Sequence, residues 1–347
     1  KPRRFDVVRA IIHIESVESR MLSEGVGLIR IKSFQSNTCE DMNEALAALR
    51  KKAIRGLVLD LRDNPGGLLQ QAVCAADMFL TSGTIVTTSS NDPNKRDRKL
   101  SRRDGTEPAY PMVVLANGGS ASASEIVAGA LQSHDRALVI GQKTFGKGSV
   151  QVLYDDKRDG WALKLTVAQY LTPGDVSIQG VGIVPDIAID SMTVDRLDMD
   201  LEVNKGYLRE SDLSAHLTHD RARDSVEPSV VMRYYLPLET RQRLQQAEPE
   251  ELEQNEREDE FLTRFSRDLL AGAKRSGRRD MLQDAGPVIE QTRAEEMKLA
   301  VKELRKLGVD WSLGPNQGPS EVKVKVSTSQ PENVARAGDP FQLVVQV

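Results

Sequence analysis

The sequence is poor in the residues on which many catalytic and metal sites depend. Among 347 residues it has four histidines and two cysteines, and its formal net charge is only −4. Cys39 and Cys74 lie far apart without a metal-binding pattern, so we expect two separate buried thiols rather than a disulfide. No apolar run approaches the ~20 residues of a membrane span, and no signal peptide opens the chain. This composition favours a soluble enzyme over a nucleic-acid-binding or membrane protein.

The histidines offer two weaker hypotheses. His134 precedes Asp135 and could serve a Ser-His-Asp triad, but the pair is more typical of a polar turn between a helix and a strand. His216 and His219 are three residues apart and could ligate a metal from one face of a helix. No third well-spaced ligand accompanies them, so a solvated helix face is the simpler interpretation.

Three serines, Ser120, Ser122 and Ser124, lie where a predicted strand gives way to a predicted helix. The apolar run 111–116 is typical of a buried strand, and the two glycines after Asn117 permit a tight turn. From about residue 122 apolar side chains recur at helical spacing. The unpaired N–H groups and the positive dipole end of a helix N-terminus favour the negative charge of a tetrahedral oxyanion. The alternative is that one of these serines merely caps the helix.

A lysine follows the next predicted strand. Residues 137–140 form that strand, and Lys147 then lies in a turn between Gly146 and Gly148. A serine hydroxyl needs a base to become a good nucleophile, and a lysine can be that base only in its neutral form, which burial favours. Without such a role the Gly-Lys-Gly turn would be an ordinary solvated loop. It lacks the spacing of a phosphate-binding loop.

Four segments resemble the C-terminal processing peptidases, the tail-specific Ser-Lys proteases of bacteria and plastids. They occur in the family's order and include the motifs Leu-Asp-Leu-Arg-Asp-Asn-Pro-Gly-Gly, Ser-Ala-Ser-Ala-Ser-Glu and Phe-Gly-Lys-Gly-Ser-Val-Gln. The four segments are residues 27–34, 57–67, 120–151 and 178–186. Because they span most of residues 20–190 in the expected order, chance is a poor explanation.

The resemblance assigns roles to individual residues. It implies that Ser122 is the nucleophile, that Lys147, 25 residues later, is the general base, and that Gln151 orients the lysine. It implies two oxyanion donors, the backbone N–H of Ala123 and that of a glycine in the Asn-Pro-Gly-Gly turn, where we favour the first glycine, Gly66. It implies no metal and no cofactor.

The resemblance also implies a function and a setting. We expect a serine endopeptidase that cleaves near the C-terminal tails of unfolded or envelope proteins, in the periplasm or cell envelope. Its partners would be protein or peptide substrates bound through that tail, with an activating partner or a homo-oligomer in addition, and no nucleic acid. The alternative is a partner-gated or scaffold member of the same fold that acts mainly by binding proteins. An acyl-CoA enzyme of the broader architecture is disfavoured by the Ser-Lys pair.

Alternating predicted strands and helices indicate an α/β fold with a partly parallel sheet. The resemblance implies that this is a ClpP/crotonase-like α/β protease core. Residues 91–107 are charged, and we expect them to form an exposed loop. The other expected elements are strands near 27–34, 55–61, 84–89, 149–154 and 161–171 and helices near 38–52 and 67–80.

We expect four regions along the chain. Residues 1–19 are the C-terminal remnant of a PDZ domain and a linker, as the resemblance implies, and residues 20–190 are the Ser-Lys peptidase core. Residues 191–315 are a charged helical extension, in which the acidic run 248–260 is a solvated helix or linker, or else a site for a basic partner. Residues 316–347 contain two predicted strands and begin a β-sandwich-like module.

Overall fold

A computed structural model describes most of the chain. The described residues are 15–90, 92, 96–156, 160–195, 199–200, 208–213, 227–246, 261–309, 325–328 and 343–346. Several expectations therefore fall outside the description, namely those for the acidic run 248–260, for His216 and His219, and for most of region 1–19.

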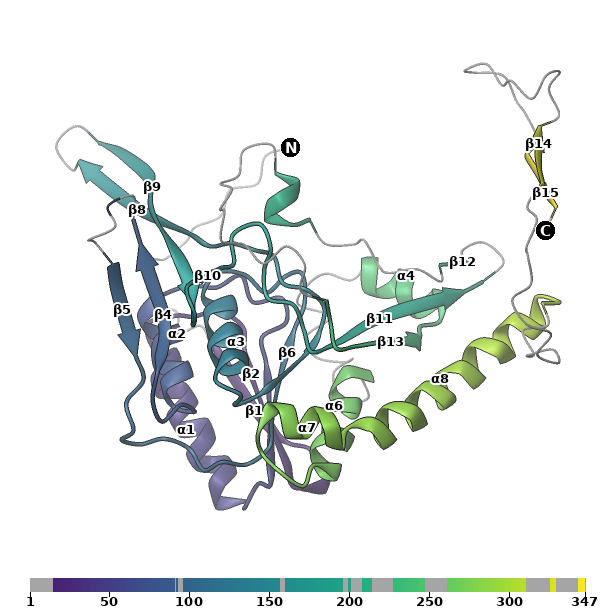
Figure 1. Cartoon of the computed structure of the whole chain (residues 1–347), viewed down its shortest axis with the longest axis horizontal. Coiled ribbons are helices and arrows are strands. Elements are labelled where there is room, and N and C mark those ends of the chain that lie inside the picture. The colour runs from purple at the N-terminus through teal and green to yellow at the C-terminus, as the bar shows by residue number, and fades with distance from the viewer. Residues whose placement is uncertain are drawn as a thin grey trace, which may run out of the picture.

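A central sheet of eight strands organises the fold (Figure 1). Its order is β1-β2-β3-β6-β7-β11-β12, and β13 also pairs with β11. All pairs are parallel except those that β1 and β12 make. The strands are β1 Val17–Met21, β2 Val26–Ile31, β3 Gly56–Asp60, β6 Met112–Ala116, β7 Leu138–Gly141, β11 Ile187–Val194, β12 Met199–Asp200 and β13 Val230–Tyr235. The predicted α/β fold with a partly parallel sheet is confirmed.

Helices cover both faces of this sheet. In β3, Leu57 and Leu59 pack into one core with α1, α2 and α3, whereas Val58 packs into a second core with α6, α7 and the start of α8. The central strands are apolar at successive positions because both of their faces are buried. The helices are α1 Thr38–Lys51, α2 Leu69–Asp77, α3 Ala123–Ser133, α6 Phe261–Gly272, α7 Arg278–Asp284 and α8 Gly286–Lys306. None of the helices in the described ranges is both long and apolar enough to cross a membrane.

A second sheet of five strands has the order β10-β9-β4-β5, with β8 also paired to β9. Its strands are β4 Thr84–Ser89, β5 Arg96–Leu100, β8 Ser149–Asp156, β9 Trp161–Thr172 and β10 Val176–Ser177. The expectation of an exposed loop over residues 91–107 was wrong in part, because β5 pairs antiparallel with β4 there. Charged side chains are common on an edge strand, so composition alone could not separate it from a loop.

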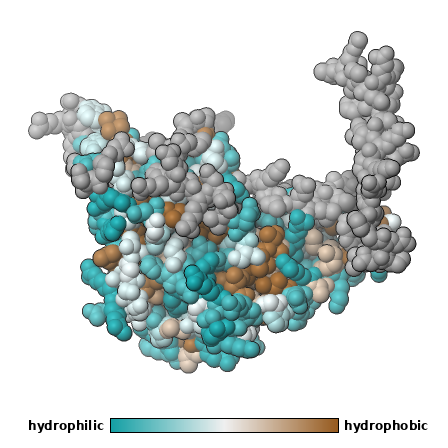
Figure 2. Space-filling model, viewed as in Figure 1, coloured by the Kyte–Doolittle hydropathy of each residue, from teal (hydrophilic) through white to brown (hydrophobic). Residues whose placement is uncertain are grey.

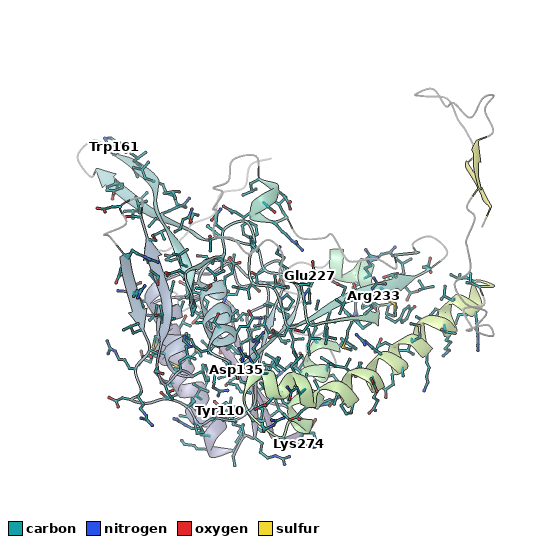
Figure 3. All side chains as sticks on the ribbon, viewed as in Figure 1. Tyr110, Asp135, Trp161, Glu227, Arg233 and Lys274 are labelled. Atoms are coloured by element: carbon teal, nitrogen blue, oxygen red, sulfur yellow. A yellow bond between two sulfur atoms is a disulfide. The ribbon has the colours of Figure 1, made fainter. Side chains whose placement is uncertain are left out.

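The β8–β9 hairpin carries much exposed apolar surface. It projects from the body of the molecule in Figure 1, and Trp161 marks its tip in Figure 3. Half of the exposed large apolar side chains of the described residues belong to this hairpin, including Leu153 at 62% exposure and Leu163 at 46%. Figure 2 shows hydrophobic surface near the tip. The hairpin begins two residues after Lys147, so this surface adjoins the lysine turn.

The segment after residue 190 is joined to the core. β11 runs across that position, and α7 is tied to the turn that follows α3. Arg278 donates from Nη2 to Asp186 Oδ1 at 2.6 Å, and its backbone N–H donates to the carbonyl of Asp135 at 2.9 Å. The pKa of Arg278 is raised, mainly because its side chain donates hydrogen bonds to Asp186. The ion pair therefore fixes α7 against the core.

The remaining C-terminal elements are shorter. They include a 3₁₀ turn at Glu210–Asp212, α4 at Leu238–Gln246, and the antiparallel pair β14 Lys325–Thr328 and β15 Leu343–Gln346. Only Ala285 separates α7 from α8, and Pro287 lies in the first turn of α8. Proline fits the first turn of a helix because it lacks a backbone N–H, and an N–H in that turn has no acceptor within the helix. The division of the chain into four regions, and the sandwich module, stay predictions.

Cys39 and Cys74 form a disulfide, so the expectation of two separate thiols was wrong. Their Cα atoms are 6.0 Å apart, which is typical of a disulfide. The bond joins α1 to α2, and Gln71 reinforces the junction by accepting the Cys39 N–H at 2.8 Å. Sequence reasoning missed the bond because the pairing depends on how two helices, 35 residues apart at the cysteines, pack together.

Candidate active site

The site lies where β3 and β6 end, at the carboxyl edge of the parallel sheet. The loops after these strands lie side by side because the strands pair directly. Asp63 donates its N–H to Asn117 Oδ1 at 3.0 Å, and Ala121 donates its N–H to the carbonyl of Asn64, also at 3.0 Å. The Asn-Pro-Gly-Gly turn is thus fastened to the serine turn. Ligands of open parallel sheets bind at this edge.

The three serines of the motif have different environments. Ser120 is buried and donates its hydroxyl to the carbonyl of Leu61 at 2.8 Å. Ser124 is also buried and donates to the carbonyl of Asn64 at 2.9 Å. Ser122 is partly exposed. Two of the serines therefore hold the loops together, and Ser122 is the one whose hydroxyl a substrate can reach.

Ser122 has a strained backbone. Its φ of 55° lies in the left-handed region, with ψ at −108°, and it directly precedes the first residue of α3. A residue other than glycine occupies such a conformation at a cost of order 1–3 kcal/mol, and such residues cluster at active sites. The geometry resembles the strained serine turn of other hydrolases, which presents the hydroxyl above a helix N-terminus.

Gly66 lies directly against Ser122. Its φ is +104°, and a Cβ there would meet the carbonyl oxygen of Ala121 at 2.8 Å, Ser122 Cβ at 2.9 Å and the nitrogen of Ala123 at 3.0 Å. Only glycine fits this close approach. The N–H of Ala123 opens α3 and has no acceptor within the helix. The two expected oxyanion donors are thereby brought together beside Ser122.

The two donors differ in one respect. The N–H of Gly66 donates to the side-chain oxygen of Asn64 at 2.9 Å, so it must turn from that oxygen to serve an oxyanion. Gly67, the less favoured candidate, packs its backbone against Phe34. The structure thus places Gly66, rather than Gly67, against Ser122 and Ala123.

Glu125 joins the serine segment to the lysine segment, and sequence reasoning missed it. It is completely buried in the first turn of α3. Its Oε2 accepts the backbone N–H of Ser122 and that of Lys147, both at 2.8 Å. Its Oε1 accepts the N–H of Gly146 at 2.7 Å and the hydroxyl of Thr144 at 2.5 Å. The backbone nitrogens of Ser122 and Lys147 donate to the same oxygen, so the distance between them is at most twice the 2.8 Å length of each hydrogen bond.

The sequence did contain a signal for Glu125. Ser122 and Glu125 have the Ser-x-x-Glu spacing of a capping box, in which the glutamate accepts the N–H of the residue that precedes the helix. Burial raises the pKa of the Glu125 carboxyl to about 7, and the four hydrogen bonds that it accepts oppose this rise. All four neighbours are donors, so the arrangement suits the ionised carboxylate.

The turn that contains Lys147 is held on its other side by residues 179–182. The N–H of Gly180 donates to the carbonyl of Gly146 at 2.9 Å, and Gly148 donates its N–H to Gln179 Oε1 at 2.9 Å. A Cβ on Gly148 would lie 2.9 Å from the nitrogen of Gln179. The two glycines around Lys147 therefore allow two loops to pack without space for a side chain.

The side chains expected to carry the chemistry are near one another but not all in contact. Lys147 is half-buried, and Gln151 is exposed on β8, next to a bulge between Val150 and Gln151. Within the described ranges, no hydrogen bond joins the Ser122 hydroxyl to Lys147 or joins Lys147 to Gln151. The backbone brings the Ser122 and Lys147 segments together, whereas the orienting role of Gln151 stays a prediction.

The other sequence hypotheses find no support at this site. His134 follows the last residue of α3, about 18 Å from Ser122 at 1.5 Å per residue, and one ring nitrogen is hydrogen-bonded to the carbonyl of Thr84 at 2.7 Å. Among the described residues no group of three potential metal ligands occurs. His134 therefore has a structural contact rather than a place beside Ser122.

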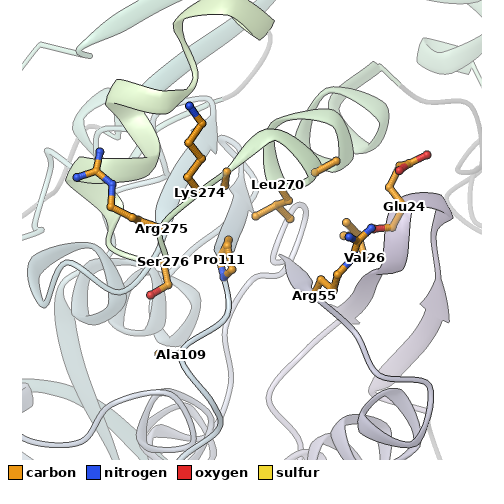
Figure 4. Close-up of a pocket in the computed structure, with 11 residues that line it drawn as sticks. Glu24, Val26, Arg55, Ala109, Pro111, Leu270, Lys274, Arg275 and Ser276 are labelled. Atoms are coloured by element: carbon orange, nitrogen blue, oxygen red, sulfur yellow. The ribbon is translucent and has the colours of Figure 1, made fainter.

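The molecule also has a cavity of about 300 Å³, which lies elsewhere (Figure 4). It is lined by Val26 at the start of β2, by Arg55 and Pro111, which immediately precede β3 and β6, and by Leu270 and Lys274 at the end of α6 and just after it. These residues lie at the amino ends of the parallel strands, opposite the edge that carries Ser122. The cavity therefore does not belong to the serine site.

Comparison with known proteins finds a similarity to one peptidase family. Residues 25–189 match the sequence profile of peptidase family S41. This part of the chain is therefore similar to the S41 peptidases. Ser122, Lys147 and Gln151 all lie within the S41 match, as does Glu125.

Relatives of the S41 core are C-terminal processing proteases. The chain is 44% identical over 227 residues to the carboxy-terminal-processing protease of Bartonella bacilliformis, a match covering 62% of this chain and 50% of that protein. It is 38% identical over 193 residues to the carboxyl-terminal-processing protease of Synechocystis sp., which covers 54% and 44%. The chain thus spans about half the length of these curated relatives. A solved structure, photosystem II D1 C-terminal processing protease, is 35% identical with a TM-score of 0.47, covering 51% of this chain and 49% of that one.

Proposed function

We propose that the chain is a serine endopeptidase that uses Ser122 as nucleophile and Lys147 as general base. The observation that carries the proposal is Glu125, whose buried carboxylate binds the backbone of both residues through one oxygen. A carboxylate in this position holds the nucleophile and base segments in register. The match of residues 25–189 to the S41 family supports the same conclusion.

The mechanism follows from the chemistry of these groups. Neutral Lys147 takes the proton of the Ser122 hydroxyl as the oxygen attacks a peptide carbonyl. The resulting oxyanion is stabilised by the N–H of Ala123, at the positive end of α3, and by the N–H of Gly66 once it turns from Asn64. Protonated Lys147 then donates to the leaving amine as the C–N bond breaks. Finally it activates the water that hydrolyses the acyl-enzyme.

We infer that the substrates are unfolded or envelope proteins, which are cleaved near their C-terminal tails. The support is the family resemblance and the names of the relatives, which are processing proteases of carboxyl termini. We propose a periplasmic or cell-envelope location. The Cys39–Cys74 disulfide supports this location because disulfides persist mainly in oxidising compartments.

A second candidate is a partner-gated member of the same fold. Two observations favour it: the N–H of Gly66 is occupied by Asn64, and the Ser122 hydroxyl makes no hydrogen bond to Lys147 in the described structure. A partner or a homo-oligomer that rotates the Gly66 peptide would then complete the site. Under this alternative the isolated chain binds proteins and cleaves them only when the partner is present.

The two candidates are separated by cleavage of an unfolded reporter protein with an apolar C-terminal tail. The wild type and Ser122→Ala are compared from mildly acidic to alkaline pH. Serine-dependent cleavage that rises toward alkaline pH supports the always-active enzyme. Binding of the reporter without cleavage, restored by an added partner, supports the gated form. Cleavage of equal rate by Ser122→Ala would overturn both.

A further inference from the structure

A short segment beyond the S41 match returns to the lysine turn. The match ends at residue 189, yet the 3₁₀ turn Glu210–Asp212 lies against residues 145–148. The backbone N–H of Glu210 donates to the carbonyl of Phe145 at 3.1 Å. Phe145 in turn donates its N–H to the carbonyl of Ser120, at 3.0 Å. Residues 208–213 therefore contact the turn directly through the backbone.

The side chain of Glu210 reaches the same turn through Gln179. Glu210 Oε1 accepts from Gln179 Nε2 at 3.0 Å, and Gln179 Oε1 accepts the N–H of Gly148 at 2.9 Å. Gln179 is 2% exposed, so its amide has little access to water. The two hydrogen bonds form a continuous path from Glu210 to the residue after Lys147.

The chemistry of the two groups gives this path a direction. A glutamine amide has one donor end and one acceptor end, and it can turn over to exchange them. An ionised glutamate only accepts, so Glu210 binds the donor end and holds the acceptor end toward Gly148. The hydrogen bond to Glu210 is charge-assisted and thus stronger than a neutral one. Without Glu210, the buried donor end of Gln179 would lose this acceptor, and only the hydrogen bond from Gly148 would hold the amide in this orientation.

We propose that Glu210 is a positioning residue for Lys147, acting through Gln179, an inference that rests on the proposed Ser-Lys mechanism. Lys147 is then fixed on both sides. Glu125 holds its own N–H, and Glu210 fixes the N–H of the next residue by way of Gln179. Small displacements of a general base lower the rate of proton transfer more than they lower substrate binding. The effect of Glu210 therefore falls on kcat.

The kinetic test compares three variants on a short peptide substrate. Glu210→Ala removes the acceptor and should lower kcat about tenfold with KM unchanged, the size expected for a lost charge-assisted hydrogen bond. Glu210→Gln keeps an acceptor oxygen and should stay within about threefold of wild type. Ser211→Ala is the matched control, because it alters the exposed neighbour in the same 3₁₀ turn. Equal losses in Glu210→Ala and Ser211→Ala would mean that the turn matters only as local structure, which overturns the proposal.

Two further measurements separate this inference from the proposed function. In a Gln179→Ala background, Glu210→Ala should cause no further loss of kcat, since the path is already broken. Hydrogen exchange of the Gly148 amide should be faster in Glu210→Ala than in wild type, whether or not the protein cleaves peptides. A wild type without activity would sink the proposed function but leave the exchange test valid. Unchanged exchange at Gly148 would refute the role of Glu210.

Discussion

Glu125 accepts the backbone N–H of Lys147 at 2.8 Å from the first turn of the helix that follows Ser122. The proposed nucleophile and the proposed base come from loops at the ends of two neighbouring parallel strands, so their relative position could vary with either loop. A shared buried carboxylate removes much of that freedom. Its burial raises its pKa to about 7, so the protein gives up stability to keep the charge there.

The first prediction concerns the proposed dyad. Ser122→Ala and Lys147→Ala should each reduce cleavage of the unfolded reporter to background, because one removes the nucleophile and the other the base. His134→Ala should have little effect, since its contact is with Thr84. Circular dichroism and thermal unfolding check that the variants fold. Turnover near wild type by Lys147→Ala would contradict the dyad.

The second prediction concerns the charge of Glu125. The pKa of its carboxyl is about 7 in the folded protein and about 4.5 for a solvated glutamate, so the folded protein binds this proton more tightly than the unfolded chain does. The stability that this proton contributes is full below about pH 4.5 and is lost as the pH rises through 7. Relative to Glu125→Gln, the wild type should lose about 3 kcal/mol of unfolding free energy across that range.

The activity of the same site should change in the opposite direction. The four donors around Glu125 require a carboxylate, so cleavage should rise as the pH rises through about 7. Glu125→Gln puts an amide donor among these donors, and kcat should fall at least tenfold at every pH. Chemical denaturation and kcat measured over pH 4.5–9 test both effects. A wild-type stability curve parallel to that of Glu125→Gln would contradict the raised pKa.

The third prediction concerns the close approach of Gly66. Gly66→Ala places a methyl group 2.9 Å from Ser122 Cβ, and it should lower kcat about a hundredfold by moving an oxyanion donor. Gly105→Ala is the control, because Gly105 also has a positive φ, of +79°, but a Cβ there would meet nothing within 4 Å. Both variants incur the backbone cost, and only the first crowds the site. Equal kcat for the two variants would argue against Gly66 as a donor.

The fourth prediction concerns the disulfide. Cys39 and Cys74 are 35 residues apart in the sequence, and chain-entropy arguments assign such a bond about 3–4 kcal/mol. A reductant should therefore lower the midpoint of thermal unfolding of the wild type. The double variant Cys39→Ser, Cys74→Ser should start from the lower midpoint and not respond to the reductant. An unchanged midpoint of the wild type in the reductant, with both thiols shown to be free afterwards, would contradict a stabilising disulfide.

The sequence predicted much of this fold because its strands and helices alternate clearly. The expected helix near 38–52 is observed as Thr38–Lys51, and the strand near 84–89 as Thr84–Ser89. Local patterns set these elements, since apolar spacing reports which face is buried. The edge strand β5 was missed because an exposed edge strand need not have the apolar spacing of a buried face.

The site was predicted less fully, for a physical reason. Sequence motifs and the family resemblance named Ser122 and Lys147, but the contact between their segments depends on the register of β6 against β7. Glu125 had the spacing of a capping box, yet its partners Thr144 and Gly146 lie about twenty residues away. The disulfide likewise depends on the packing of α1 against α2. Long-range packing of this kind has no local signature.

The second core of the central sheet has a consequence for the order in which the protein is made. Val58 and Val113, from the middle of the sheet, pack against Phe265 and Leu269 of α6. A chain still being synthesised cannot bury these strands until α6 has left the ribosome, more than a hundred residues after Lys147. We expect the proposed dyad to be completed late, so that the proposed activity would be absent while the chain is still being made. A chain ended at residue 190 should accordingly aggregate and bind hydrophobic dyes, and a monomeric, cooperatively folding product would refute this expectation.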